Sequence, residues 1–143
     1  MRIVGATSRI CKPAENRRVR VTRIDGYIEP DIMTIKPVAW LGDSRDQVSG
    51  FPAQARRVAG FELWEVQQGA EPSDWKPMPS VGLGVNEIRV RAGGAFRLIY
   101  VAKFSEAVYV LHAMEKKSRK TEKADIDLAR KRFRDLVQER KRR

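Results

Sequence analysis

The sequence is poor in the side chains that build covalent or metal-held structure. Its 143 residues include one cysteine, Cys11, and one histidine, His112. A single cysteine excludes an internal disulfide and fits a reducing compartment. One cysteine with one histidine cannot form a zinc site of the usual kind. We therefore expect any chemistry here to use neither a metal nor another cofactor.

Long apolar runs and acidic residues are also scarce. No apolar stretch approaches the roughly 18 residues that a membrane-spanning helix needs, and no signal peptide is recognisable. Asp plus Glu number 18 against 29 Lys plus Arg, which gives a formal net charge of +11. We expect a cytoplasmic protein with a polyanionic partner, either nucleic acid or an acidic protein that masks the charge, and no membrane partner.

Residues 1–33 differ from the rest of the chain. Their apolar positions keep neither the helical nor the strand period over any length, although 18–24 could form a short edge strand. We interpret 1–33 as an N-terminal extension, either disordered or the result of an upstream start assignment with Met33 as the physiological start. Peptides from 1–32 in the native protein, detected by mass spectrometry, would contradict that start. Residues 34–143 are expected to form the single domain.

The patterning of residues 34–143 predicts an α+β fold. Strands are expected at 35–41, 86–91, 95–104 and 107–114, and helices over 43–48, over 52–69 and from about Glu122. Short turns join the last three strands as hairpins, so we expect a small antiparallel or mixed sheet of about four strands. Two N-terminal helices should cover one face, with a C-terminal helix after the sheet. Residues 70–84, rich in Pro, Ser and Gly, are expected to form a loop.

Alternation along two of these strands separates apolar from basic side chains. The expected apolar row is Phe96, Leu98, Tyr100, Ala102 and Phe104. Because two helices can cover only one face, this row should pack beneath them. Arg89, Arg91 and Arg97 should then lie on an open face of the sheet.

Further basic residues border that face at the end of the last strand. They are His112, Lys116, Lys117, Arg119 and Lys120. Together with the three arginines they make a plausible site for a phosphate backbone. Simpler interpretations stay open: Arg89 and Arg91 could be an ordinary solvated strand face, Arg97 could pair with Glu87, and His112 could be a packed core residue.

Three stretches together resemble the HigB-like, phage-derived branch of the RelE/ParE toxin superfamily. They are "KPVAWLGDSR", "DWKPMPSVGLGVNEIRVRAGGAFRLIYVAKF" and "AVYVLHAMEKKSRKT". The resemblance covers about Lys36 to Arg140 and implies a RelE-like fold. It also implies a bacterial or phage-encoded toxin of a type II toxin–antitoxin system, paired with an antitoxin, helix-turn-helix and HigA-type, from the adjacent gene.

RelE-like toxins cleave mRNA on the ribosome without a metal, by attack of a ribose 2′-OH on the adjacent phosphate. The resemblance assigns a catalytic part to Arg97 in "FRLIY", to Arg89 in the preceding strand and to Lys116 and Lys117 after the last strand. Arg91, Arg119 and Lys120 would bind the RNA phosphates. The tyrosine that RelE-type members carry after the basic pair is missing here, where residues 121–123 stand instead. His112 could substitute for it in part.

Two other functions remain possible from the sequence. One is a ParE-like toxin that poisons a topoisomerase by binding, which needs no catalytic cations. The other is a basic, phage-derived nucleic-acid-binding module, for which charge alone suffices. For an antitoxin contact the candidates are Phe61, Trp64 and the basic C-terminal helix, although core packing is the simpler interpretation of the two aromatic residues.

Overall fold

The computed structural model describes residues 2–3, 23–24, 27–28, 35–118 and 121–143. Most of the N-terminal extension, Arg119 and Lys120 lie outside these residues. The interpretation of 1–33 as an extension with a start at Met33, and the assignment of Arg119 and Lys120 to phosphate binding, therefore stay predictions.

The described chain contains a mixed sheet and three helices, which confirms the predicted α+β fold. The elements are β1 (Arg2–Ile3), β2 (Arg23–Ile24), β3 (Tyr27–Ile28), β4 (Val38–Trp40), α2 (Ser44–Ser49), α3 (Ala53–Gln67), β5 (Trp75–Pro77), β6 (Val85–Arg91), β7 (Ala95–Val101), β8 (Val108–Glu115) and α4 (Lys123–Lys141). The sheet order is β1-β4-β8-β7-β6-β5. Only β4 and β8 pair in parallel among these neighbours. The β2–β3 pair is separate.

The sheet is larger than the sequence predicted, because residues 70–84 are not all loop. Trp75–Pro77 form β5 on the outer side of β6, with Trp75 opposite Ile88 and Lys76 opposite Glu87. Proline is tolerated on an edge strand, where its missing N–H need not enter the ladder. The other expected strands and helices are present with bounds shifted by a few residues.

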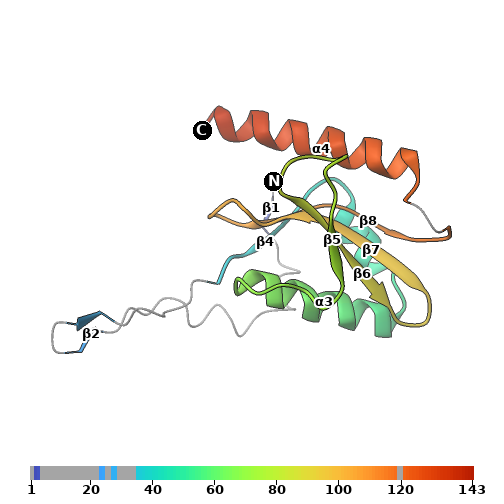
Figure 1. Ribbon diagram of the computed structural model, residues 1–143, viewed down its shortest axis with the longest axis horizontal. Helices are drawn as coiled ribbons and strands as arrows, with labels where there is room; N and C mark the ends of the chain where they lie inside the picture. Colours follow the sequence, from blue (N-terminus) through green and yellow to red (C-terminus); the bar gives the residue numbers. More distant parts are fainter. Residues whose placement is uncertain (1, 4–22, 25–26, 29–34, 119–120) are drawn as a thin grey trace.

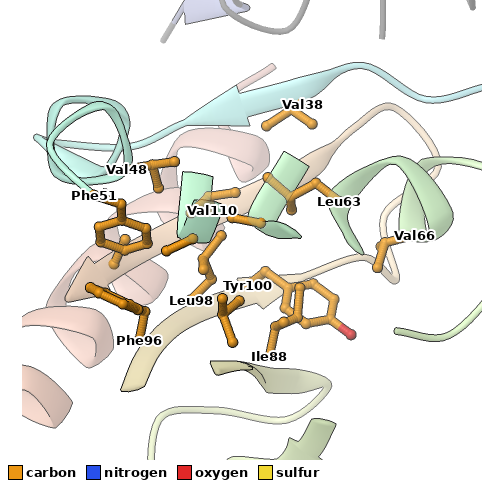
Figure 2. Packing of buried hydrophobic residues seen from close by; sticks show 14 of the residues in the cluster. Val38, Val48, Phe51, Leu63, Val66, Ile88, Phe96, Leu98, Tyr100 and Val110 are labelled. Carbon is orange, nitrogen blue, oxygen red and sulfur yellow. The ribbon is translucent and has the colours of Figure 1, made fainter. Parts of the chain in front are cut away.

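Helices α2 and α3 pack on one face of the sheet, as predicted. Figure 2 shows Val48 and Phe51 from this helical layer lying over the strand residues Phe96, Leu98 and Val110. The Phe51 and Phe96 ring centroids are 4.6 Å apart. On α3, Ala55, Ala59, Leu63 and Val66 form the buried stripe. The apolar row of β7 is thus covered on this side.

The opposite face was expected to be open, and this expectation is wrong. Helix α4 lies across it, so the sheet is held between α4 and α3 (Figure 1). Ile99 and Val101, which share the row of Arg97, are fully buried against this side. The apolar stripe of α4 consists of Ile126, Ala129, Phe133 and Leu136. Such a stripe must be buried against another apolar surface, which the sheet provides here. Only the part of the face near the start of α4 can therefore hold a site.

The apolar row of β7 is also shorter than predicted. The strand ends at Val101, and Phe104 packs with the residues under α4 instead of with Phe96 and Leu98. The Arg140 guanidinium lies over the Phe104 ring, 3.8 Å from its centroid. The alternation of side chains cannot be extended past the end of a strand.

A bulge interrupts the pairing of β7 with β8. Ile99 lies opposite His112, but the next residue, Tyr100, lies opposite Val110, so Leu111 is the extra residue. A bulge of this kind shifts the alternation of all following side chains by one position. Leu111 packs on the α4 side, and His112 also bonds to α4, whereas Ala113 returns to the α3 side.

Candidate functional site

The register of the sheet brings basic residues from three strands together. Arg89 of β6 lies directly opposite Arg97 of β7, and Arg91 lies opposite Ala95. The backbone of Lys116, just after β8, donates a hydrogen bond to the Ala95 carbonyl at 2.7 Å. We call Arg89, Arg91, Arg97 and Lys116 the cationic cluster. Four of the residues expected in the site therefore meet on the face that carries α4.

The bulge in β8 is what places Lys116 on this face. If β8 kept all its residues but had no bulge, position 116 would face the same side as Val108 and Val110, which pack on the α3 side. Because Leu111 is an extra residue, positions 112, 114 and 116 lie instead on the side of Arg97 and α4. Nothing in the apolar pattern of β8 signals this change.

Arg97 is the least exposed member of the cluster. Its side chain is 11% exposed, and its Nε lies 3.6 Å from a carboxylate oxygen of Glu87. One of its terminal nitrogens donates a hydrogen bond to the Phe96 carbonyl at 3.2 Å. Burial lowers the pKa of Arg97, Glu87 opposes the shift, and Arg89 and Arg91 add to it. The guanidinium nevertheless stays protonated, as arginine does in proteins.

Glu87 is a buried carboxylate at the centre of the site. Its side chain is 1% exposed, and its second oxygen accepts a hydrogen bond from the Thr121 hydroxyl at 3.0 Å. The sequence offered Glu87 only as a possible ion-pair partner of Arg97. Thr121 carried no signal, because the residues just before α4 have no regular pattern. Together, Glu87 and Thr121 fix the position of Arg97.

Asp74 holds the two more exposed arginines. Its carboxylate lies 3.6 Å from Arg89 Nε and 3.8 Å from a terminal nitrogen of Arg91. The Arg89 backbone N–H also donates to the Asp74 carbonyl at 2.9 Å. The side chain of Arg91 is 66% exposed, so this ion pair leaves most of its charge toward solvent. Sequence reasoning missed Asp74 because it placed residues 70–84 in a loop.

Lys116 and Lys117 differ in their surroundings. Both line a cavity of about 250 Å³ between the end of β8 and the start of α4, which Thr121 also lines. Burial and then Arg97 lower the pKa of Lys116, with smaller contributions from Lys76 and Arg89, while Glu87 raises it. Lys117 is 73% exposed and lies 3.8 Å from Glu115. Burial and the cluster thus act together on Lys116.

His112 is held away from the cluster. Its side chain is 8% exposed, and its Nε2 lies 2.8 Å from an Asp125 carboxylate oxygen on α4. The other ring nitrogen is buried and makes no hydrogen bond within the described part of the chain. This geometry fits the simpler interpretation, that His112 is a packed residue, here one that ties β8 to α4.

A comparison with models of protein families shows which family the chain belongs to. The family model described as phage-derived protein Gp49-like (DUF891) matches residues 46–134. The chain belongs to this family. Gp49-like proteins are associated with RelE-type toxins of toxin–antitoxin systems. No curated protein matches the chain. The matched range contains the whole cationic cluster, Glu87 and His112.

The site of this Gp49-like protein can bind anions and stabilise negative charge. Arginines arranged on a rigid sheet are suited to phosphate oxygens, because their donors form a fixed fork. A lysine whose pKa is lowered by its neighbours can also exchange a proton more readily at neutral pH.

Among the described residues, no helix combines the length and apolar composition that would let it cross a membrane.

Proposed function

We propose that this Gp49-like protein is the toxin of a type II toxin–antitoxin system, of the HigB-like branch. Its activity would be metal-independent, ribosome-dependent cleavage of mRNA in the cytoplasm. The observation that carries the proposal is the meeting of Arg89, Arg97 and Lys116 on one sheet face, with the pKa of Lys116 lowered there. This combination supplies both charge stabilisation and a proton-transfer group.

The chemistry needs no group that the chain lacks. The ribose 2′-oxygen attacks the adjacent phosphorus and loses its proton to neutral Lys116, and the bond from phosphorus to the 5′-oxygen breaks. The leaving 5′-oxygen takes up a proton from solvent, Lys116 returns its proton to solvent, and a 2′,3′-cyclic phosphate remains on the other fragment. Arg97 and Arg89 would stabilise the charge that develops on the pentavalent phosphate. Arginine cannot accept the proton, because it stays protonated.

The other expected residues take supporting parts in this proposal. Arg91 and Lys117 are exposed enough to bind flanking phosphates, and Arg119 and Lys120 are assigned the same part although they lie outside the described residues. His112, bonded to Asp125, would position β8 against α4 and would not touch the RNA. The partners would be the ribosome, mRNA and a HigA-type antitoxin.

A second candidate function is binding of nucleic acid without cleavage. The ion pair of Arg97 with the buried Glu87 favours it. Glu87 already neutralises part of the positive charge with which Arg97 would stabilise a reacting phosphate. A ParE-like topoisomerase poison would also need no proton-transfer group. Neither alternative needs Lys116 as a base, so both predict that no transcripts are cleaved.

Inducible expression of the protein and its variants, with primer extension on cellular mRNA, tests the proposal. We expect growth arrest and cleavage within codons from the wild type, and a loss of cleavage of at least about a hundredfold for Lys116→Met and Arg97→Lys. Arg97→Lys keeps a positive partner for Glu87, so that the variant can fold. Arg134→Met, on the exposed side of α4, is the matched control and should cleave normally.

Three results would contradict the ribonuclease proposal. Arrest without cut transcripts would favour a binding toxin, DNA-damage signalling would point to a topoisomerase, and the absence of any toxicity would favour a binding module. Normal cleavage by Lys116→Met would remove the assigned base. A helix-turn-helix reading frame beside the gene would support the antitoxin part of the proposal.

A further inference from the structure

A groove on the other side of the molecule is separate from the cationic cluster. It has a volume of about 580 Å³ and runs between α2 and α3, with Trp40 of β4 at its base; its lining residues include Arg45, Arg56, Arg57, Phe61 and Trp64. Trp40 and Val48 belong to the core between the sheet and α2 and α3, whereas the cluster lies on the α4 side. Whatever binds in the groove therefore does not compete for the cluster.

The floor of the groove is aromatic. Phe61 is 55% exposed and, with Leu83, is one of the two exposed large hydrophobic residues in the described part of the chain. The Trp40 indole N–H is buried and has no hydrogen-bond acceptor there. A large exposed aromatic ring in a groove is costly for a free surface. The exposed ring fits a groove that is filled by another chain, whereas the indole N–H is too deeply buried for an occupant to reach.

The rim of the groove is positively charged. Arg45, Arg56 and Arg57 line it, and none of the lining residues in the described part of the chain is acidic. Arg56 donates a hydrogen bond to the Phe51 carbonyl, whereas Arg45 and Arg57 form no ion pair within the described residues. Elsewhere in the described chain most exposed arginines and lysines pair with carboxylates, as on α4. The occupant should supply the missing negative charge.

The geometry points to a docking site for an acidic amphipathic segment of a protein partner. Apolar side chains of that segment would cover Phe61 and Trp64, and its carboxylates would meet Arg45 and Arg57. That the partner is the antitoxin rests on the function proposed above, but the docking chemistry does not. The segment would leave the cationic cluster open, so any block of RNA cleavage would come from the rest of the partner.

The three tryptophans of the chain provide the test. Trp40 and Trp64 line the groove, while Trp75 lies on β5. The probe is a synthetic peptide of about 16 residues with leucine on one helical face and glutamate elsewhere. In ¹H–¹⁵N spectra of the full chain, we expect saturable shifts of the Trp40 and Trp64 indole signals and an unchanged Trp75 signal. A peptide with glutamine in place of glutamate should bind at least about tenfold more weakly.

Charge reversal separates docking from a loss of folding. The double variant Arg45→Glu, Arg57→Glu should lose at least about tenfold in affinity for the glutamate peptide and should now prefer the corresponding lysine peptide. Arg134→Glu with Lys141→Glu makes the same change in net charge on α4 and should bind like the wild type. An unchanged Trp75 signal shows that each variant is folded. These readouts need no toxin activity, so they stand apart from the ribonuclease test.

Four results of the binding experiments would overturn the inference. They are equal binding of the glutamate and glutamine peptides, an equal shift at Trp75, failure of the double variant to prefer the lysine peptide, and tighter binding of an RNA oligonucleotide at Trp40 and Trp64. If light scattering finds a dimer that Arg57→Glu separates into monomers, the occupant is a second copy of this chain and the inference is also wrong.

Discussion

At the scale of single residues, the restraint on Arg97 is the main feature of the site. Glu87 and Thr121 hold the guanidinium from one side, and the Phe96 carbonyl accepts one of its hydrogen bonds. A side chain fixed in this way loses little conformational entropy when it binds a phosphate. The cost is the neutralisation of part of its charge by Glu87.

Lys76 provides a test of the electrostatic tuning of Lys116. Lys76 lies in β5, opposite Glu87 of β6, and its positive charge lowers the pKa of Lys116. Replacing it by methionine removes a nearby positive charge, so the pKa of Lys116 should rise. If Lys116 is the base, the rise of cleavage rate with pH should then move to higher pH. The pH profile of RNA cleavage in vitro on ribosomes measures this shift.

The control for this prediction is Lys123→Met. Lys123 is exposed and pairs with Asp127 at 3.0 Å, outside the cluster. Its replacement should leave the pH profile in place. A profile that does not move in Lys76→Met, with cleavage otherwise intact, would show that Lys116 is not the group that titrates.

Sequence reasoning found the cations of the site but not the residues that hold them. Arg89, Arg91 and Arg97 were recognised because a basic side chain in an apolar, alternating strand is conspicuous. Asp74 and Thr121 lie in segments without a period, so only the folded structure shows their contacts. The placement of His112 under α4 could not be predicted either, because no pattern in the sequence indicates the bulge before it.

At the scale of elements, the docking of α4 decides which part of the sheet stays accessible. Arg132 connects three elements, because it donates hydrogen bonds to the Leu111 carbonyl at 2.8 Å and to Asp43, before α2, at 2.9 Å. At the C-terminal end, Arg140 pairs with Glu106 at 2.6 Å. These contacts hold both halves of the helix in place over the sheet.

Gly82 permits the close approach of α4 to the loop before β6. A Cβ at this position would lie 2.4 Å from carbons of the Phe133 ring, which is packed under the helix. Gly82→Ala should therefore lower the free energy of unfolding by about 1–3 kcal/mol through overpacking. Urea denaturation measures this change.

Two variants check that the effect of Gly82→Ala comes from the steric conflict. Gly50→Ala should be much milder, because its nearest contacts would be ordinary ones at 3.6 Å. Adding Phe133→Leu to Gly82→Ala should recover part of the lost stability, since it removes the conflicting ring. Equal stabilities for Gly82→Ala and the wild type would show that the loop moves away from α4 without cost.

Glu106 makes the contact at the C-terminal end of α4 sensitive to acid. Hydrogen bonds from Arg140 and Tyr109 lower the pKa of its carboxyl to about 2, although burial opposes the shift. A carboxyl whose pKa is lowered by folding contributes stability above its unfolded pKa and loses it as pH falls. The contribution should thus disappear between about pH 4.5 and pH 2.

Thermal unfolding of the wild type and of Glu106→Gln across this pH range tests the prediction. The variant should be less stable at neutral pH, and the difference should shrink as pH falls toward 2. Glu139→Gln is the control, since among the described residues the Glu139 side chain pairs with exposed Arg142 alone, at 3.4 Å. A stability difference that stays constant with pH would contradict the assignment to Glu106.

The elements themselves were largely predictable, but their arrangement was not. Strong alternation and short turns mark β6, β7 and β8, and the apolar stripe of α4 is evident in the sequence. A stripe shows which side of a helix is buried, however, not which face of a sheet it meets. The short strand β5 has only three residues and ends at a proline, so its composition resembles a loop.

At the scale of the whole molecule, β7 and β8 form the centre of the fold. Each has neighbours on both sides, and apolar layers cover both faces of the sheet there. Amides in the middle of these strands should therefore exchange with deuterium only on global unfolding. Hydrogen-exchange mass spectrometry should find Leu98–Val101 among the slowest segments and α4 faster. Slower exchange in α4 would contradict this order.

The extra residue in β8 and the bulge that accommodates it together decide which face Lys116 occupies. Up to Val110, the even-numbered residues of β8 face α3. After Leu111, the odd-numbered residues such as Ala113 face α3 instead. Deleting Leu111 would leave a regular strand in which both halves keep their faces, so Lys116 would stay beside Arg97, whereas closing the bulge with Leu111 retained would turn Lys116 toward the α3 side. Relatives and designed variants should therefore have both the extra residue and the bulge, or neither.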